Sequence, residues 1–150
     1  MASTDTNSAP PFFMGEFCHA LDGKNRLTVP SAWRVEEEAE FFLMPSSSGE
    51  CLKVMMRGEI ERIRGLAAAL PGPQRTQVLR ALGAGIRQCK LDKAGRIVVP
   101  EEFCKSQSLA GDVTMVGAME TFEIWNTQIW EAARAKTVAV ATPHLADFGL

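Results

Sequence analysis

An aspartate followed four residues later by an arginine occurs twice in this chain of 150 residues, as Asp22/Arg26 and as Asp92/Arg96. The planar guanidinium of arginine can bind phosphate oxygens, or the edge of a guanine base, through two parallel hydrogen bonds. The aspartate can instead pair with the arginine and close a turn, a contact worth only about 0–1 kcal/mol when it is exposed. The residues alone leave both interpretations open, and both hold if the aspartate fixes the arginine in a binding pose.

The residues beside these pairs extend the candidate site. Binding to nucleic acid needs cations that meet phosphates and planar donors that read base edges, and the two segments contain both. The predicted DNA-contacting residues are Lys24, Asn25, Arg26, Lys93 and Arg96, with Asp22 and Asp92 in supporting roles. Four second-rank candidates are expected to be solvated surface, namely Arg34, Arg87, Gln88 and Lys90.

Each pair lies in a longer duplicated stretch, residues 21–30 and 91–100, in which Leu, Asp, Arg, Val and Pro recur at the same positions. Asp, Gly and Asn tolerate the backbone conformations of a tight turn. The branched aliphatic residues after each arginine suit a buried strand, and the proline ends that strand and suits the start of a helix. Each copy is therefore predicted to form a strand, a tight turn, a second strand that completes a hairpin, and a helix.

The rest of the pattern predicts an α+β, β-rich fold. Four short strands are expected in each half, at residues 15–21, 26–29, 41–44 and 51–55, and then at 86–91, 96–99, 113–116 and 121–125. Helices are expected at 31–40, 58–70, 74–82 (closed by Gly83 and Gly85), 100–109 and 126–135. Because each set of strands alone leaves open edges, the two halves are expected to pack as one pseudo-twofold, barrel-like unit with flanking helices.

This organisation divides the chain into five expected segments. A flexible tail (1–13) precedes a first repeat (14–57), connecting helices (58–85), a second repeat (86–129) and a C-terminal helix and tail (130–150). Four aromatic side chains are expected to pack in the core or at a subunit interface, namely Trp33, Phe103, Trp125 and Trp130.

The charge distribution favours a local anionic partner. The chain has a formal net charge of −2, but residues 19–34 and 86–105 together hold eight Lys and Arg against four Asp and Glu. The duplicated segments are thus basic islands in an acidic protein. No apolar run is long enough to span a bilayer, which argues against a membrane partner. The sequence has no recognisable leader, and its four cysteines are dispersed, so we expect reduced thiols in a cytosolic protein.

Catalysis and metal binding find little support in the sequence. The only histidines are His19 and His144, and neither belongs to a nucleophile or metal motif. Cys18, His19 and Cys89 could meet if the halves are related by symmetry, but their spacing fits no zinc-ligand pattern. We therefore expect no enzyme activity, no small-molecule substrate, no cofactor and no metal.

The duplicated motif resembles the MraZ family of bacterial transcriptional regulators. The first repeat is carried by Gly15-Glu16-Phe17, His19, Leu21-Asp22, Lys24, Arg26-Leu27 and Val29-Pro30, and the second by Leu91-Asp92-Lys93, Gly95-Arg96-Ile97 and Phe122-Glu123-Ile124-Trp125. The resemblance covers about residues 14–131. The chain departs from the family at Asn25, where glycine is common, and at Ala94, where a polar residue is common.

The resemblance implies two SpoVT/AbrB-like domains fused in one chain, and ring-like homo-oligomers that bind direct repeats in the promoter of the division and cell-wall gene cluster. It associates Arg26 and Arg96 with DNA contact and places the protein in the cytoplasm, at the nucleoid. Related domains also act as antitoxins or adaptors, so an interaction module that does not bind DNA is the alternative.

Overall fold

The computed structural model describes residues 12–34 and 36–150. Its strands are β1 (Glu16–Ala20), β2 (Arg26–Thr28), β3 (Glu40–Pro45), β4 (Leu52–Met55), β5 (Arg87–Lys90), β6 (Arg96–Val98), β7 (Asp112–Gly117) and β8 (Phe122–Asn126). The α-helices are α1 (Arg57–Ala68), α2 (Gly72–Gly85), α3 (Glu101–Ser106) and α4 (Thr127–Asp147), and a 3-10 turn, η2, spans Ser31–Trp33. The α+β, β-rich class predicted from the sequence is confirmed.

The strands form two antiparallel sheets rather than a barrel. Six strands pair in the order β1-β7-β8-β4-β3-β5, and β2 pairs with β6 in a separate two-stranded ribbon. The larger sheet is not closed, since β1 and β5 are its two edges, so the expected barrel-like closure is wrong.

The hairpins predicted within each copy are also wrong, because the strands of each copy pair across the two halves. β1 pairs with β7, β5 pairs with β3, and β2 pairs with β6. The physical reason lies in the short strands after each arginine, whose inward side chains Leu27 and Ile97 are opposite each other and are 0% and 1% exposed. Pairing the two copies with each other buries both apolar side chains at once.

An aromatic cluster forms the centre of the core beneath the sheet. The rings of Trp33 and Phe122 lie 4.9 Å apart between centroids, and Phe13 and Phe41 also pack against Phe122. The predicted burial of Trp33 and Phe103 is confirmed, with exposures of 1% and 6%. Trp125 and Trp130, both 6% exposed, form a second small cluster with Cys51.

Four expected helices differ from those found, and one of them, α3, ends at Ser106 rather than at residue 109. The segment predicted as a helix at 31–40 ends after η2, and Arg34 is already extended because the chain must reach β3, where Glu40 pairs with Lys90 of β5. Helix α2 continues to Gly85, so Gly83 and Gly85 do not close it earlier. Helix α4 continues to Asp147, well beyond residue 135, because its alanine-rich sequence favours helix and tolerates Pro143.

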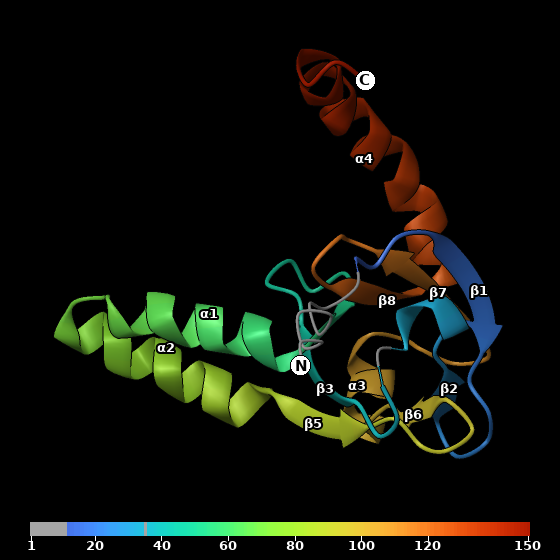
Figure 1. Cartoon of the computed structure of the whole chain (residues 1–150), viewed down its shortest axis with the longest axis horizontal. Helices are drawn as coiled ribbons and strands as arrows, with labels where there is room; N and C mark the ends of the chain where they lie inside the picture. Colours follow the sequence, from blue (N-terminus) through green and yellow to red (C-terminus); the bar gives the residue numbers. More distant parts are fainter. Residues whose placement is uncertain (1–11, 35) are drawn as a thin grey trace, which may run out of the picture.

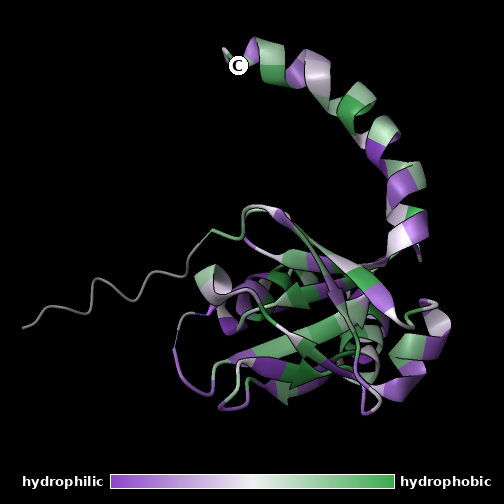
Figure 2. Cartoon of the chain, turned by 90° about the vertical axis from the view of Figure 1, so that its right-hand side faces the viewer, coloured by the Kyte–Doolittle hydropathy of each residue, from purple (hydrophilic) through white to green (hydrophobic). Residues whose placement is uncertain are grey.

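Helices α1, α2 and α4 project from the sheets, whereas α3 lies beside the strands (Figure 1). α1 and α2 form a helical hairpin on one side, and α4 extends away from the body on another, with the C-terminus at its far end. Apolar and polar residues alternate around α4 (Figure 2), and Trp130 is its one buried residue. Among the described residues, no helix is long and apolar enough to cross a membrane.

Most of the predicted N-terminal tail, residues 1–11, lies outside the described residues. Phe13, at its end, is 1% exposed and bridges to Met119.

Candidate nucleic-acid interface

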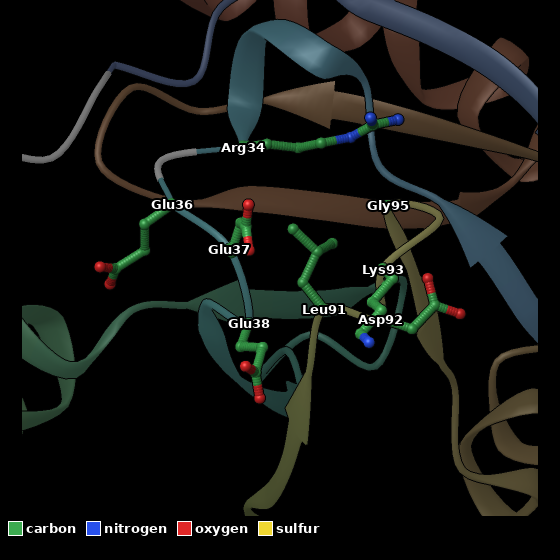
Figure 3. Close-up of a pocket in the computed structure, with 8 residues that line it drawn as sticks. All are labelled: Arg34, Glu36, Glu37, Glu38, Leu91, Asp92, Lys93 and Gly95. Carbon is green, nitrogen blue, oxygen red and sulfur yellow. The ribbon is translucent and has the colours of Figure 1, made fainter.

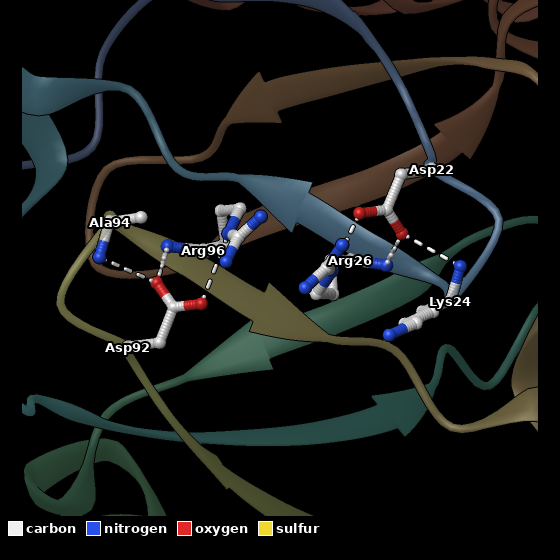
Figure 4. A network of polar contacts seen from close by, with 6 residues as sticks. All are labelled: Asp22, Lys24, Arg26, Asp92, Ala94 and Arg96. Atoms are coloured by element: carbon white, nitrogen blue, oxygen red, sulfur yellow. Dashed lines mark hydrogen bonds and ion pairs between the residues drawn. The ribbon is translucent and has the colours of Figure 1, made fainter.

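The two Asp-x-x-x-Arg turns have the same hydrogen-bond pattern (Figure 4). Oδ1 of Asp22 accepts from the backbone N–H groups of Lys24 and Arg26, both at 2.9 Å, and Oδ2 accepts from Nε of Arg26 at 2.6 Å. In the second turn, Oδ1 of Asp92 accepts from the N–H of Ala94 at 2.9 Å and of Arg96 at 2.8 Å, and Oδ2 accepts from Nε of Arg96 at 3.0 Å. Each carboxylate therefore closes its turn and holds its arginine.

These hydrogen bonds keep the aspartates ionised. The backbone N–H of Arg26 is the largest cause that lowers the pKa of Asp22 to about 2. The N–H of Arg96 lowers the pKa of Asp92 in the same way. At neutral pH both carboxylates are negative, and each fixes one edge of a guanidinium. Within the described residues, the terminal nitrogens of the two arginines have no hydrogen-bond partner, which leaves them available to a ligand.

The tip of each turn needs a left-handed backbone. Asn25 has φ 59° and Gly95 has φ 80°, conformations that asparagine and glycine adopt more readily than other residues. The carbonyl of Asn25 accepts from the N–H of Val99 at 2.8 Å, and that of Gly95 accepts from the N–H of Val29 at 2.9 Å. The tip of each turn is thus bonded to the strand that follows the other turn.

The ribbon places both arginines on one outward face. Arg26 is directly opposite Val98, and Thr28 is directly opposite Arg96. Because side chains alternate along a strand, these four residues share the face that points away from buried Leu27 and Ile97. The arginine side chains are 32% and 33% exposed. In Figure 4 the two guanidiniums lie toward the middle of the ribbon, with the aspartates outside them.

The predicted lysines have different surroundings. Lys24 is exposed at the tip of the first turn, beside Asn25. Lys93 is exposed at the rim of a surface cavity of about 360 Å³, lined also by Asp92, Gly95, Leu91, Arg34 and the three glutamates 36–38 (Figure 3). The two turns lie at opposite ends of the antiparallel ribbon, with both arginines on the outward face between them, and Lys93 shares its cavity with the glutamates 36–38 (Figure 4).

Three further residues lie beside the two turns or on the outward face of the ribbon, namely Arg34, Thr28 and Val98. Nε of Arg34 donates to the carbonyl of Val29 at 2.9 Å, and its guanidinium lies against Gly95, where an added Cβ would fall 2.3 Å from Cζ. Arg34 is thus exposed, as expected, and its guanidinium also contacts the second turn. Thr28 and Val98, which the sequence did not single out, share the outward face of the ribbon with the arginines because of the strand register.

The other second-rank candidates lie on β5 and take part in ion pairs or hydrogen bonds elsewhere. Nε of Arg87 donates to Oε1 of Glu102 at 2.8 Å, and Gln88 donates to Glu40. Lys90 is exposed at the end of the same strand. None of the three lies on the β2–β6 ribbon.

The structure separates the residues considered for zinc. Cys18 and His19 lie on β1 and Cys89 lies on β5, which are opposite edges of the six-stranded sheet, so the adjacency considered from symmetry is wrong. Across residues 12–34 and 36–150, no group of three or more metal-ligating side chains is close enough to hold an ion.

Comparison with known proteins agrees with the duplicated motif. Residues 82–144 match a family described as "MraZ protein, putative antitoxin-like". A protein of Lachnoclostridium phytofermentans named Transcriptional regulator MraZ is 32% identical over 139 residues, which cover 92% of this chain and 98% of that protein. A relative of the same name from Pediococcus pentosaceus is 33% identical, and the match covers 92% of this chain and 99% of that protein. Another, from Caulobacter vibrioides, is 30% identical, and the match covers 89% of each chain. The chain belongs to the MraZ family.

Proposed function

We propose that this protein is a sequence-specific DNA-binding transcriptional regulator that uses the outward face of the β2–β6 ribbon and its two turns. One observation carries the proposal: two arginines lie on one face, and each is held at Nε by its own ionised aspartate. The contact residues are Lys24, Asn25, Arg26, Lys93 and Arg96, and Asp22 and Asp92 position the arginines.

The size of the ribbon suits the major groove. B-DNA admits a two-stranded β-ribbon there, and arginine reads guanine by donating from two nitrogens to O6 and N7. Within each guanidinium, the aspartate binds only Nε, so the terminal nitrogens of Arg26 and Arg96 can face a base edge. The lysines can then contact phosphates. Fixing the arginines before binding also reduces the side-chain entropy lost on association.

Self-assembly would raise the affinity of this small surface. We propose a ring-like homo-oligomer that binds repeated promoter elements of the division and cell-wall gene cluster, at the nucleoid in the cytoplasm. Exposed apolar side chains on the projecting helices support self-association, among them Leu66, Val138, Val140 and Leu145. Linked binding events can increase avidity by about 10²–10⁴-fold when the geometry allows simultaneous contacts.

We further propose that residues 14–57 and 86–129 are two SpoVT/AbrB-like repeats related by a pseudo-twofold axis, with 58–85 as connecting helices and 130–150 as the C-terminal helix. The strand order supports this relationship. β1 and β5 occupy the two edges, β7 and β3 lie inside them, and β8 and β4 are central, so that equivalent strands hold equivalent places.

A mobility-shift assay on the DNA upstream of the protein's own gene tests the proposal. Arg26→Ala with Arg96→Ala should weaken binding at least about 30-fold, because each bidentate arginine–guanine pair is worth about 1–3 kcal/mol. The matched control is Arg75→Ala with Arg80→Ala, which removes the same charge from exposed positions on α2. Light scattering on every variant checks that the oligomer is intact.

A salt series in the same assay shows whether contacts to phosphates drive binding. Affinity should fall steeply with salt, because each neutralised phosphate adds about −0.9 to the slope of log K against log salt. Unchanged binding by the double arginine variant would show that another surface is used. No binding by the unmutated protein would favour the alternative, an antitoxin-like or adaptor module.

A further inference from the structure

Two apolar groups lie between the arginines on the outward face of the ribbon. Val98 is directly opposite Arg26, and Thr28 is directly opposite Arg96. Val98 is 54% exposed, whereas Val29 and Val99, just after the two strands, are fully buried. An isopropyl group and a threonine methyl group therefore share the surface that carries the two guanidiniums.

The spacing of opposite side chains on this face corresponds to between one and two steps of stacked base pairs. Directly opposite side chains in an antiparallel pair have Cβ atoms about 4.5–5.5 Å apart. Neighbouring base pairs are stacked about 3.4 Å apart. An arginine that reaches one base pair in the major groove thus places the side chain opposite it against an adjacent base pair.

Only one base offers a partner for a methyl group in that groove. Thymine has a C5-methyl group there, and alanine, the threonine methyl and phenylalanine are the side-chain groups known to contact it. The wholly apolar end of Val98 offers nothing to the N4 amino group of cytosine, whereas the hydroxyl of Thr28 can bond to several bases. The two sides of the ribbon therefore differ in how strictly they select.

We propose that Val98 and Thr28 read thymine methyl groups next to the bases bound by Arg26 and Arg96, with Val98 the stricter of the two. This inference rests on the proposed function, because it needs the ribbon to enter the major groove. It adds specificity-determining residues to a surface otherwise defined by charge. It also predicts that the two halves of the ribbon select bases with different strictness, because valine is opposite one arginine and threonine is opposite the other.

The test uses two versions of the same upstream DNA, amplified with thymidine or with deoxyuridine triphosphates. Uracil lacks only the C5-methyl group and keeps every hydrogen-bonding group of thymine. The unmutated protein should bind the thymine version more tightly by about fourfold for each methyl contact, the size expected for burying one methyl-sized group. Val98→Ala removes both γ-methyl groups and leaves only a β-carbon that lies farther from the base, so its thymine preference should be smaller than that of the unmutated protein. Thr28→Ser should lose the preference that comes from its own methyl contact, and both variants should match the unmutated protein on uracil DNA.

Met119→Ala is the matched control. Met119 is 51% exposed, close to the 54% of Val98, but lies in the turn between β7 and β8, away from the ribbon strands and the projecting helices. This variant should keep the full thymine preference of the unmutated protein.

Three results would overturn the inference. The first is an unmutated protein that binds both DNA versions equally well. The second is a Val98→Ala variant that loses the same affinity for both DNA versions. If its oligomeric state also changes, this face is a contact between copies of the chain. The third is an unmutated protein that binds neither version, and this result alone also refutes the proposed function.

Discussion

The carbonyl of Asn25 accepts a hydrogen bond from the N–H of Val99 at 2.8 Å, although the two residues belong to different copies of the duplicated motif. Gly95 and Val29 make the reciprocal bond at 2.9 Å. The conformation of each arginine-bearing turn is therefore set partly by the other. A change that distorts one tip should alter both turns.

Gly95→Ala should destabilise the fold by about 1–3 kcal/mol. Alanine is strained at φ 80°, and its Cβ would displace the Arg34 guanidinium from its place beside Val29. Gly83→Ala is the opposite control, because Gly83 lies within α2 with no atom within 4 Å of an added Cβ, and it should stabilise by about 0.5–1 kcal/mol. Urea unfolding followed by tryptophan fluorescence measures both changes. Equal stability of Gly95→Ala and the unmutated protein would contradict the strain inferred at this turn.

Asp22→Asn should remove part of the acid sensitivity of the fold. Folding lowers the pKa of Asp22 from 3.8 to about 2, so the ionised carboxylate stabilises the fold above pH 4 and this stabilisation is lost as the pH falls through 2. The variant should be less stable than the unmutated protein at pH 7, and the difference should shrink between pH 4 and pH 2. Thermal unfolding across this range provides the measurement. Gly83→Ala, which changes no ionisable group, should keep a constant difference from the unmutated protein over this pH range.

Arg26→Lys should separate charge from base reading. Lysine keeps the positive charge but cannot donate two parallel hydrogen bonds to guanine, nor bind Asp22 through an Nε–H while doing so. We expect the preference for the upstream DNA over random DNA to fall about 10-fold or more while the salt dependence stays nearly constant. Competition titrations at two salt concentrations measure both quantities. A preserved preference would mean that Arg26 contacts only phosphate.

A chain that ends at residue 135 should keep its fold but change its assembly. Of the residues of α4, only Trp130 is buried, with its ring 5.1 Å from that of Trp125, so removal of residues 136–150 leaves the core intact. The urea midpoint should be unchanged, whereas Trp130→Ala should lower stability by about 3–5 kcal/mol. Light scattering should show a smaller particle for the shortened chain. An unaltered particle would place the contacts between copies elsewhere, for example on α1 and α2.

The turns could be predicted from the sequence because their geometry is local. Asp22 bonds to groups two and four residues away, and Asn25 or Gly95 supplies the left-handed tip, so the types and spacing of these residues determine the structure. The partner of each strand could not be predicted in the same way. The apolar alternation that buries Leu27 and Ile97 is satisfied equally by a local hairpin and by pairing across the two halves.

The same limit explains the residues that were missed. Val98 and Thr28 became candidates only once the register placed them opposite the arginines. Arg34 became a packing residue only once Gly95 was beside it. Helix α4 was predicted too short because sequence patterns favour helices that bury one face, and this one buries almost none.

The ribbon that carries both arginines takes one strand from near residue 27 and the other from near residue 97. A ribosome that has made only the first half has produced one strand with an unpaired edge and an exposed leucine. The outward face of the β2–β6 ribbon forms only after the second strand has been synthesised. Under the proposed function, an incomplete chain lacks the DNA-binding surface, so chains that terminate early should not compete with finished ones for the promoter.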